Sequence, residues 1–280
     1  MEGSPDKRGA EAFERYYSQL FGARWAALRA SMLAPEQSQY ALTTHADRPY
    51  YIDRASVFVA QAAVSGAART ILDLCAAPGG KTLVLALACA NDCTIVANER
   101  SAARRERLRR VLGEHLGPEL GGRVTVTGHD ARRWGLYEQS AYDLVLADVP
   151  CSSEAHLLSG KGKLHEWSPS RIDRLSREQF AILRAASQAV RPGGTVVYAT
   201  CSLPRAENEE LVQRAVERSR KKGPLLSIAD AGCHDKGRIA GRLGLQLSRS
   251  DPGWRIWPDE NSGAGPMYFC MLERQTTKSE

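Results

Sequence analysis

From residue 70 to residue 221, short apolar segments alternate with longer segments in which apolar residues recur at helical spacing. The strand-like segments are residues 70–76, 93–99, 123–130, 142–150 and 194–202. The helix-like segments are residues 79–90, 101–116, 174–190 and 205–221. Strands that alternate with helices are typical of a mostly parallel sheet with helices on both of its faces. We therefore predict an α/β fold, to which the apolar stretches 253–258 and 266–273 add a last pair of strands.

The first 65 residues lack this alternation. Apolar and aromatic residues recur at helical spacing within residues 10–33, and a second helix-like segment covers residues 54–64. A polar segment, residues 34–53, separates the two. We predict an N-terminal helical extension, residues 1–65, ahead of a single α/β domain, residues 66–280.

The composition is that of a globular chain, with 280 residues, 43% of them hydrophobic and 25% charged. The net charge of +6 is compatible with a polyanionic partner but does not identify one. No segment approaches the about 18–20 consecutive apolar residues that span a membrane. The first fifteen residues carry acidic groups and no apolar run, which disfavours both a secretory signal and a transit peptide. We predict a cytoplasmic protein without membrane contact, or a mitochondrial one if the chain is eukaryotic.

The chain contains seven cysteines, which could form disulfides or bind a metal. An odd number in a chain without an export signal does not indicate a disulfide framework. Only Cys89 and Cys93 lie close together, and neither a histidine nor a second cysteine pair stands nearby. His156 and His165 likewise lack further ligands close in sequence. We therefore predict no metal site.

Carboxylates and thiols cluster where the predicted strands end. These residues are Asp73 and Cys75, then Glu99, Asp130, Asp148 and Cys151, and finally Cys201. In open α/β folds the carboxyl ends of the parallel strands form the ligand-binding edge. Taken one at a time, the two cysteines at positions 151 and 201 are compatible with core thiols, a disulfide, half of a metal site or a pair of catalytic thiols. Their common place at this edge favours a shared active site.

The segment DLCAAPGGKT, residues 73–82, joins the first strand of the alternation to its helix. Small residues let a ligand approach the backbone, and the following helix directs free N–H groups to the same place. The glycines are adjacent, and no glycine occupies position 75, so the segment is neither a GxGxxG turn nor a P-loop. Glu99 is placed to hold a ribose diol and Asp130 to reach an adenine amino group. The alternative is that both carboxylates cap the helices that follow them.

The three motifs DLCAAPGGKT, DVPCSS and VVYATCS together resemble the Nop/Sun family of RNA cytosine-5 methyltransferases, which use S-adenosylmethionine. The resemblance runs from about residue 50 to residue 215 and continues into both flanks, which most resemble the branch that acts on mitochondrial ribosomal RNA. It implies a Rossmann-like class I methyltransferase fold with a mostly parallel, seven-stranded sheet. It also implies methylation of carbon 5 of a cytosine in RNA, with ribosomal RNA favoured, and suggests a protein partner that presents the RNA.

The resemblance also implies the roles of individual residues. It places S-adenosylmethionine against Cys75, Ala76, Ala77, Pro78, Gly79, Gly80, Lys81, Glu99, Arg104, Asp130, Ala131 and Asp148. It makes Cys201 the nucleophile that attacks carbon 6 of the base, which activates carbon 5, and Cys151 the thiol that assists product release. Asp148 then stabilises the ring at its N3 or N4 edge. Lys81 is a candidate to help Cys201 form its thiolate.

The segment after the first thiol, residues 152–171, has a loop-like, basic sequence. A cytosine must leave its stack to reach a thiol in a pocket, and basic and aromatic groups beside that pocket grip phosphates and stack on bases. We therefore predict RNA contacts by Lys161, Lys163, Trp167 and Arg171. The alternatives are a transfer-RNA methyltransferase, a methyltransferase for DNA or protein, and a non-catalytic RNA-binding assembly factor. Intact cofactor and cysteine motifs disfavour the last of these.

Overall fold

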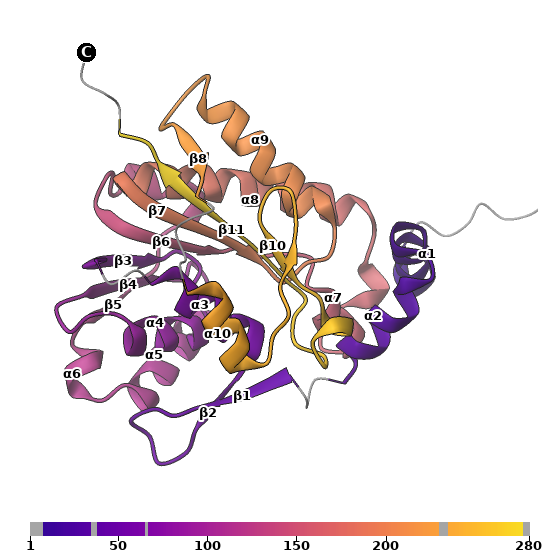
Figure 1. The fold of residues 1–280 in the computed structure, drawn as a ribbon, viewed down its shortest axis with the longest axis horizontal. Helices are drawn as coiled ribbons and strands as arrows, with labels where there is room; N and C mark the ends of the chain where they lie inside the picture. The colour runs from indigo at the N-terminus through magenta and orange to yellow at the C-terminus, as the bar shows by residue number, and fades with distance from the viewer. Residues whose placement is uncertain (1–7, 35–37, 65–66, 230–234, 277–280) are drawn as a thin grey trace, which may run out of the picture.

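The computed structural model describes residues 8–34, 38–64, 67–229 and 235–276. A nine-stranded sheet of order β5-β4-β3-β6-β7-β11-β10-β9 forms its centre, and β8 pairs with β11 (Figure 1). The parallel strands are β3 Thr70–Asp73, β4 Thr94–Asn98, β5 Val124–Thr127, β6 Tyr142–Asp148 and β7 Val190–Thr200. The antiparallel strands are β8 Leu226–Ile228, β9 Ser248–Arg249, β10 Trp254–Ile256 and β11 Met267–Arg274. The predicted α/β class is confirmed.

The sheet has more strands than the seven that we predicted. The difference lies in β8 and β9, which span only three and two residues. Segments this short do not repeat the alternation of apolar and polar residues, so the sequence pattern alone cannot detect them. Both pair with other strands of the C-terminal part of the chain and widen the antiparallel side of the sheet.

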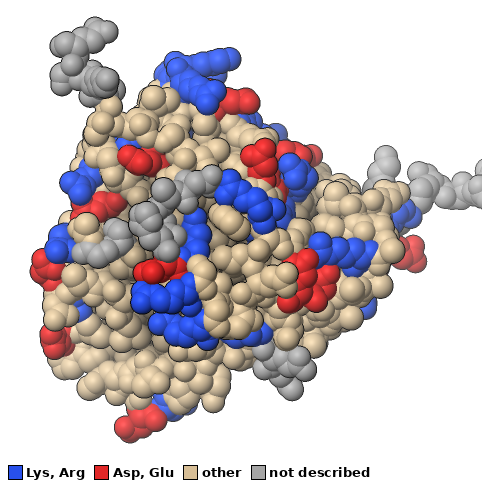
Figure 2. Space-filling view, in the orientation of Figure 1, with Lys and Arg blue, Asp and Glu red and all other residues tan. Residues whose placement is uncertain are grey.

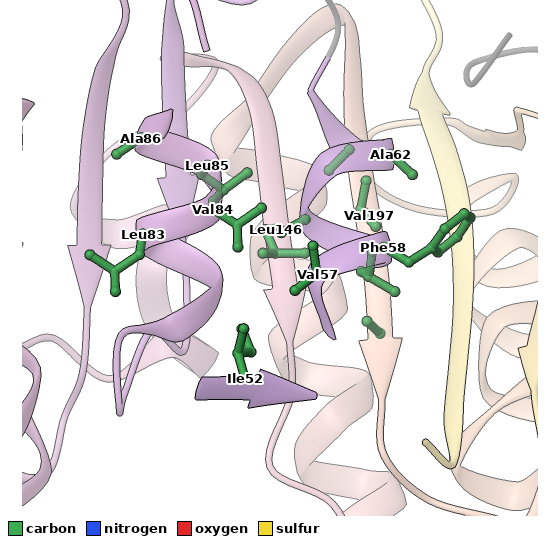
Figure 3. Packing of buried hydrophobic residues seen from close by; sticks show 14 of the residues in the cluster. Ile52, Val57, Phe58, Ala62, Leu83, Val84, Leu85, Ala86, Leu146 and Val197 are labelled. Carbon is green, nitrogen blue, oxygen red and sulfur yellow. The ribbon is translucent and has the colours of Figure 1, made fainter. Parts of the chain in front are cut away.

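Helices cover both faces of the sheet. One face carries α3 Arg54–Ala63, α4 Gly80–Ala88, α5 Ala102–His115 and α10 Lys236–Leu243, and the other carries α8 Ser170–Ala189 and α9 Glu209–Ser219. Strand β6 shows why two cores form, because Leu144 and Leu146 belong to one buried cluster and Val145 and Ala147 to the other. Figure 3 shows side chains of α3 and α4 packed against Leu146 and Val197. Shorter helices are α6 Pro118–Gly121, α7 Glu154–Leu158, η2 Ala131–Leu136, η3 Leu164–Glu166, η4 Arg205–Glu207 and η5 Pro258–Glu260.

The N-terminal region differs in detail from the predicted helical extension. The segment expected to form one helix is split into α1 Gly9–Phe21 and α2 Arg24–Met32, because Gly22 adopts a φ of 56° that ends the first helix. The polar segment that follows contains a hairpin of β1 Gln39–Leu42 and β2 Tyr50–Asp53. Helix α3 packs into the same buried cluster as the sheet residue Leu146. The domain boundary at residues 65–66 stays a prediction.

An aromatic cluster joins α1 and α2 to the segments that follow the two strand-end cysteines. Trp167 is fully buried in it, with its ring centroid 5.3 Å from that of Phe13. Leu157 and Leu203, each a few residues after one of the cysteines, lie in the same cluster. The Tyr17 hydroxyl donates a hydrogen bond of 2.5 Å to Glu154. The N-terminal helices therefore brace both loops of the candidate site described below.

On the face seen in Figure 2, lysines and arginines are interspersed with carboxylates. The net charge of +6 is thus not gathered into one patch on this face, and an anionic partner must be argued from particular groups. None of the helices in the described part of the chain has the length and apolar character that crossing a bilayer requires.

Candidate active site

The two strand-end thiols meet. Strands β6 and β7 are parallel neighbours, and the Val149 amide extends their ladder with a hydrogen bond of 3.0 Å to the Ala199 carbonyl. The chain continues from each strand to a cysteine, so that the Sγ atoms of Cys151 and Cys201 lie 2.9 Å apart. They are not joined in a disulfide, and no group of three or more metal-ligating side chains occurs among the described residues. The arrangement is that of two thiols in one site.

The surroundings make the two thiols unequal. The pKa of Cys201 lies below its usual value, mainly because Cys151 donates a hydrogen bond to its sulfur. Burial opposes this effect, while the Ser153 hydroxyl and the Lys81 ammonium add to it. The same hydrogen bond, together with burial, raises the pKa of Cys151 well above its usual value. A thiolate therefore forms more readily on Cys201, and the thiolate is the nucleophilic form of cysteine.

Asp148 and Lys81 form an ion pair beside the thiols. The Lys81 Nζ donates to the Asp148 Oδ2 at 2.9 Å and to the Ser56 Oγ at 3.0 Å. Burial acts to lower the pKa of Lys81, but the Asp148 carboxylate outweighs it and raises that pKa above the usual value. Lys81 is therefore an ammonium that also acts on Cys201. The hydrogen bond from Lys81 holds the Asp148 side chain beside the thiols.

A pocket opens at the ends of β3, β4 and β5. It is lined by Leu74, Cys75, Asn98, Glu99, Arg100, Ser101, Arg104, Asp130, Ala131, Arg132, Pro150, Glu178 and Ile182. The strand-end carboxylates 99 and 130 thus face one space, as predicted. Ala76, Ala77, Pro78, Gly79, Gly80, Lys81 and Asp148 do not line it. The pocket reaches Pro150, the residue directly before Cys151.

Charged groups organise this pocket. Glu99 is buried, accepts a hydrogen bond of 2.8 Å from the Ser101 amide, and lies 3.3 Å from Arg104. Arg104 in turn donates to the Ala77 carbonyl at 3.0 Å and so connects the carboxylate to the loop. The hydrogen bond from Arg132 lowers the pKa of Asp130 to about 2, so this group is an ionised acceptor at the pocket wall.

The paired glycines of the loop are explained by packing within the protein. Gly79 has a φ of 117°, which favours glycine, and a Cβ there would lie 3.1 Å from the Leu108 side chain. A Cβ on Gly80 would lie 2.9 Å from Ile52 of the β1–β2 hairpin. Both glycines thus leave room for α5 and the hairpin, and the expected contact of this loop with a ligand stays a prediction. Burial raises the pKa of Cys75 well above its usual value, which keeps that thiol neutral.

Asn98 is a site residue that sequence reasoning missed. It is buried, and its side chain donates to the carbonyls of Leu74 and His129 and accepts from the Thr127 hydroxyl and the His129 amide. These bonds hold the ends of β3, β4 and β5 together. The available signal was a single polar residue at the end of an apolar run, directly before Glu99.

A buried acidic pair behind Cys151 was also missed. Glu207 accepts hydrogen bonds from the Ser152 amide at 3.0 Å and from Gln179 at 2.6 Å, while Glu154 accepts from the Ser152 hydroxyl. Burial, and next the Glu154 carboxyl group, raise the pKa of Glu207 to about 7. The two acids are 53 positions apart in the sequence (207 − 154), so no local pattern reveals the pairing.

The predicted RNA-contacting residues are separated by the structure. A groove beside the thiols is lined by Ser152, Ser153, His156, Leu157, Gly162, Lys163, Glu166, Trp167, Ser168, Ser170, Arg171, Arg174 and Arg177. Lys163 lies at this groove but is 2.9 Å from Glu166, and Lys161 is exposed outside its lining. Trp167 corrects our prediction, because its ring is fully buried among aromatic side chains and presents no face on which a base can stack.

A family model described as 16S rRNA methyltransferase RsmB/F matches residues 64–272. The chain is 37% identical over 230 residues to the 5-cytosine rRNA methyltransferase NSUN4 of Xenopus laevis, a match that covers 80% of this chain and 56% of that protein. It is 34% identical over 229 residues to a mitochondrial tRNA (cytosine(34)-C(5))-methyltransferase of Danio rerio, with 80% and 60% covered. Against ribosomal RNA small subunit methyltransferase F of Escherichia coli it is 35% identical over 168 residues, with 59% and 34% covered. The chain thus spans less than two thirds of each relative.

Solved structures show the same fold. A methyltransferase homologue from Pyrococcus horikoshii superposes with a TM-score of 0.62 at 19% identity and covers 95% of both chains. NSun6 from the same organism, solved with SFG, superposes with a TM-score of 0.62 at 21% identity and covers 81% of this chain and 54% of that one. The Rossmann-like methyltransferase fold expected from the motifs is confirmed. Since the family model spans the sheet, the pocket and both thiols, the chain belongs to the RsmB/F methyltransferase family.

Proposed function

We propose that this protein transfers a methyl group from S-adenosylmethionine to carbon 5 of a cytosine in RNA, with ribosomal RNA as its substrate. One observation carries the proposal. Pro150 lines the pocket, Ser152 and Ser153 line the basic groove, and Cys151 lies between them with Cys201 at 2.9 Å. A thiol pair between a carboxylate-lined pocket and an arginine-lined groove suits a reaction that joins a cofactor to a nucleic-acid base.

The pocket residues fit S-adenosylmethionine. Glu99 is a buried carboxylate at the end of β4, where it can accept hydrogen bonds from both hydroxyls of a ribose. Asp130 is ionised and can accept a hydrogen bond from an adenine amino group. Leu74, Pro150 and Ile182 provide the apolar walls that a base requires. When bound, the cofactor supplies the electrophilic methyl group that carbon 5 takes up.

The residues at the thiol pair suit covalent activation of the base. Cys201 is the nucleophile: its sulfur bonds to carbon 6, and the electron pair of the ring double bond raises the electron density at carbon 5. Asp148, positioned by its ion pair with Lys81, accepts a hydrogen bond from the N4 amino group and so places the ring edge. The Lys81 ammonium also favours the thiolate form of Cys201 before attack.

Cys151 serves the release of the product. After methylation the carbon-5 proton must leave, the ring double bond must re-form, and the bond between carbon 6 and the Cys201 sulfur must break. Once the Cys201 sulfur is bound to carbon 6, Cys151 no longer faces a thiolate, and it loses its own proton to water. The Cys151 thiolate, a strong base because of its high pKa, then takes up the carbon-5 proton. The electron pair of the broken bond returns to the sulfur of Cys201.

The groove beside the thiols suits an RNA backbone. Arg171, Arg174 and Arg177 stand three residues apart on α8 and share one face of it. They lie toward the N-terminal end of α8, where the helix dipole disfavours cations. The three arginines therefore do not stabilise the helix through its dipole. Among the described residues none of the three is paired with a carboxylate, and the Arg171 Nε is buried without a partner. We include Lys161 and Lys163 as further RNA contacts.

Replacement of both Arg174 and Arg177 by alanine is expected to weaken RNA binding uniformly across sequences. Each lost phosphate contact removes about 0.7 from the slope of log affinity against log salt for a single strand, so the pair removes about 1.4. Fluorescence anisotropy with a labelled RNA across a salt series measures both quantities. The matched control is Arg109→Ala with Arg110→Ala, two exposed arginines of α5 away from the groove. An equal loss in the control would contradict a role specific to the groove.

Replacement of Glu99 by glutamine is expected to weaken S-adenosylmethionine binding about 10- to 100-fold. The amide still accepts the Ser101 hydrogen bond but loses the charge that strengthens both ribose hydrogen bonds. Isothermal titration calorimetry with S-adenosylmethionine measures the change. Glu106→Gln serves as the control, since that carboxylate is 78% exposed on α5. Unchanged affinity in Glu99→Gln would show that the ribose is held elsewhere.

The activity is tested with the purified chain, S-adenosylmethionine and separate pools of ribosomal and transfer RNA, followed by mapping of 5-methylcytosine. Methylation confined to ribosomal RNA supports the proposal, and methylation confined to transfer RNA assigns the alternative substrate. No methylation in naked RNA or in ribosomal subunits, alone or with cell extract, would overturn the enzymatic proposal and leave an RNA-binding assembly factor. Activity that appears only with extract would support the partner protein that we predict to present the RNA.

A further inference from the structure

Ser153 occupies the first position before helix α7, but its hydroxyl does not cap that helix. A serine at this position usually accepts a hydrogen bond from an amide of the first turn, and Ser153 makes no such bond. Its Oγ lies 3.2 Å from the Sγ of Cys151 and 3.2 Å from the Sγ of Cys201. The hydroxyl is therefore turned from the helix toward both thiols.

The backbone that places this hydroxyl is strained. Ser153 has a φ of 53° and a ψ of 60°, a left-handed conformation that a side chain disfavours by roughly 1–2 kcal/mol. The neighbouring residues hold it there. Ser152 is buried and bonded to Glu207 and Glu154, and the Ser153 carbonyl accepts from the Leu157 amide at 3.1 Å. Strain of this kind is maintained where the surrounding structure over-determines a position, often at functional sites.

We propose that Ser153 is a third catalytic side chain of the thiol site, whose hydroxyl donates a hydrogen bond to the sulfur of Cys201. This inference rests on the proposed function. The single S–H proton of Cys151 is donated to Cys201, so the Ser153 hydroxyl supplies the Cys201 thiolate with a second donor. The distances to both sulfurs lie within the range of hydrogen bonds to sulfur, and the nucleophile gains a donor in direct contact.

The hydrogen bond follows the reaction without a net transfer of the serine proton. When the Cys201 sulfur bonds to carbon 6 its negative charge disappears, and the hydroxyl turns to the Cys151 carbonyl, which lies 3.3 Å away. When that carbon–sulfur bond breaks, the electron pair returns to the sulfur and the hydroxyl donates to it again. Ser153 thus stabilises Cys201 as attacking group and as leaving group.

The test measures Cys201 directly, without RNA. The rate at which iodoacetamide alkylates Cys201 is followed against pH by mass spectrometry of its peptide, in the wild type and in Ser153→Gly, Ser153→Ala and Ser153→Thr. Removal of the hydroxyl is expected to raise the apparent pKa of Cys201 by about one unit, which slows alkylation about tenfold below that pKa. Threonine keeps the hydroxyl, so where this variant folds despite its branched Cβ at a positive φ it is expected to keep the wild-type profile.

Ser153→Gly is the decisive variant, because glycine adopts the left-handed conformation without strain and so removes the hydroxyl alone. An alkylation profile of Ser153→Gly that matches the wild type would overturn the inference, even if Ser153→Ala fails to fold. Ser159→Ala, at the exposed end of the same helix, controls for loss of a serine hydroxyl and is expected to leave the profile unchanged. Methylation by the wild type is measured in parallel, so a failure of the proposed function is seen separately.

Discussion

Replacement of Cys201 by alanine will abolish methylation and leave no covalent complex with RNA. In the proposed mechanism Cys201, whose pKa is lowered by its hydrogen bonds, is the attacking thiol, and its loss removes covalent activation of carbon 5. We expect the rate to fall by at least about a thousandfold. Transfer of labelled methyl groups to RNA measures the loss, and Cys89→Ala, at the end of α4 away from the pair, controls for loss of a thiol.

Replacement of Cys151 by alanine will instead trap the enzyme on its substrate. Cys201 still attacks, but without the neighbouring thiol the release step slows, and a protein–RNA adduct accumulates that survives denaturing electrophoresis. The adduct should require S-adenosylmethionine and be lost in the Cys201→Ala/Cys151→Ala double variant. An adduct in Cys201→Ala and none in Cys151→Ala would show that the two thiols have the opposite roles.

The largest effect on stability is expected at a buried ion pair beside the nucleophile. Arg255 of β10 donates to Glu209 at 2.6 and 2.7 Å and to the Leu203 carbonyl at 3.1 Å, two residues after Cys201. Burial raises the pKa of Glu209, but the Arg255 hydrogen bonds outweigh it and hold that pKa below its usual value. Arg255→Met leaves the buried Glu209 carboxylate without its cation, with the Ser250 hydroxyl still donating to it, and we expect a loss of about 3–5 kcal/mol in the free energy of unfolding.

Urea denaturation measures this loss, and two controls isolate its cause. The double variant Arg255→Met/Glu209→Met removes both charges and is expected to recover most of the stability. Arg24→Ala breaks a half-exposed pair with Asp259 and is expected to change the free energy of unfolding by less than about 1 kcal/mol. If Arg255→Met unfolds at the same urea concentration as Arg24→Ala, the buried pair does not stabilise the packing of β10 against α9.

Much of the fold follows from local patterns. Four of the five parallel strands lie within predicted segments, and β7 Val190–Thr200 begins four residues before the segment predicted for it. Strands buried on both faces are apolar runs, which are easily distinguished from amphipathic helices. The short strands β8 and β9 and the β1–β2 hairpin escaped prediction for the opposite reason, since their pairing depends on partners far along the chain. Trp167 was mispredicted for the same reason, because its burial depends on α1, which lies far away in the sequence. From the sequence alone, an aromatic residue in a basic loop is expected at the surface.

The sequence by itself determined the class of fold, the edge of the sheet where chemistry gathers, and the residues that stand there. These are properties of consecutive residues, and the ends of parallel strands must share an edge. Only the tertiary structure decided that Cys151 and Cys201 touch, that Lys81 pairs with Asp148, and that the Ser153 hydroxyl lies between both sulfurs. These contacts depend on which strands are neighbours and on how buried side chains such as Glu207 hold each loop, and no local pattern encodes either.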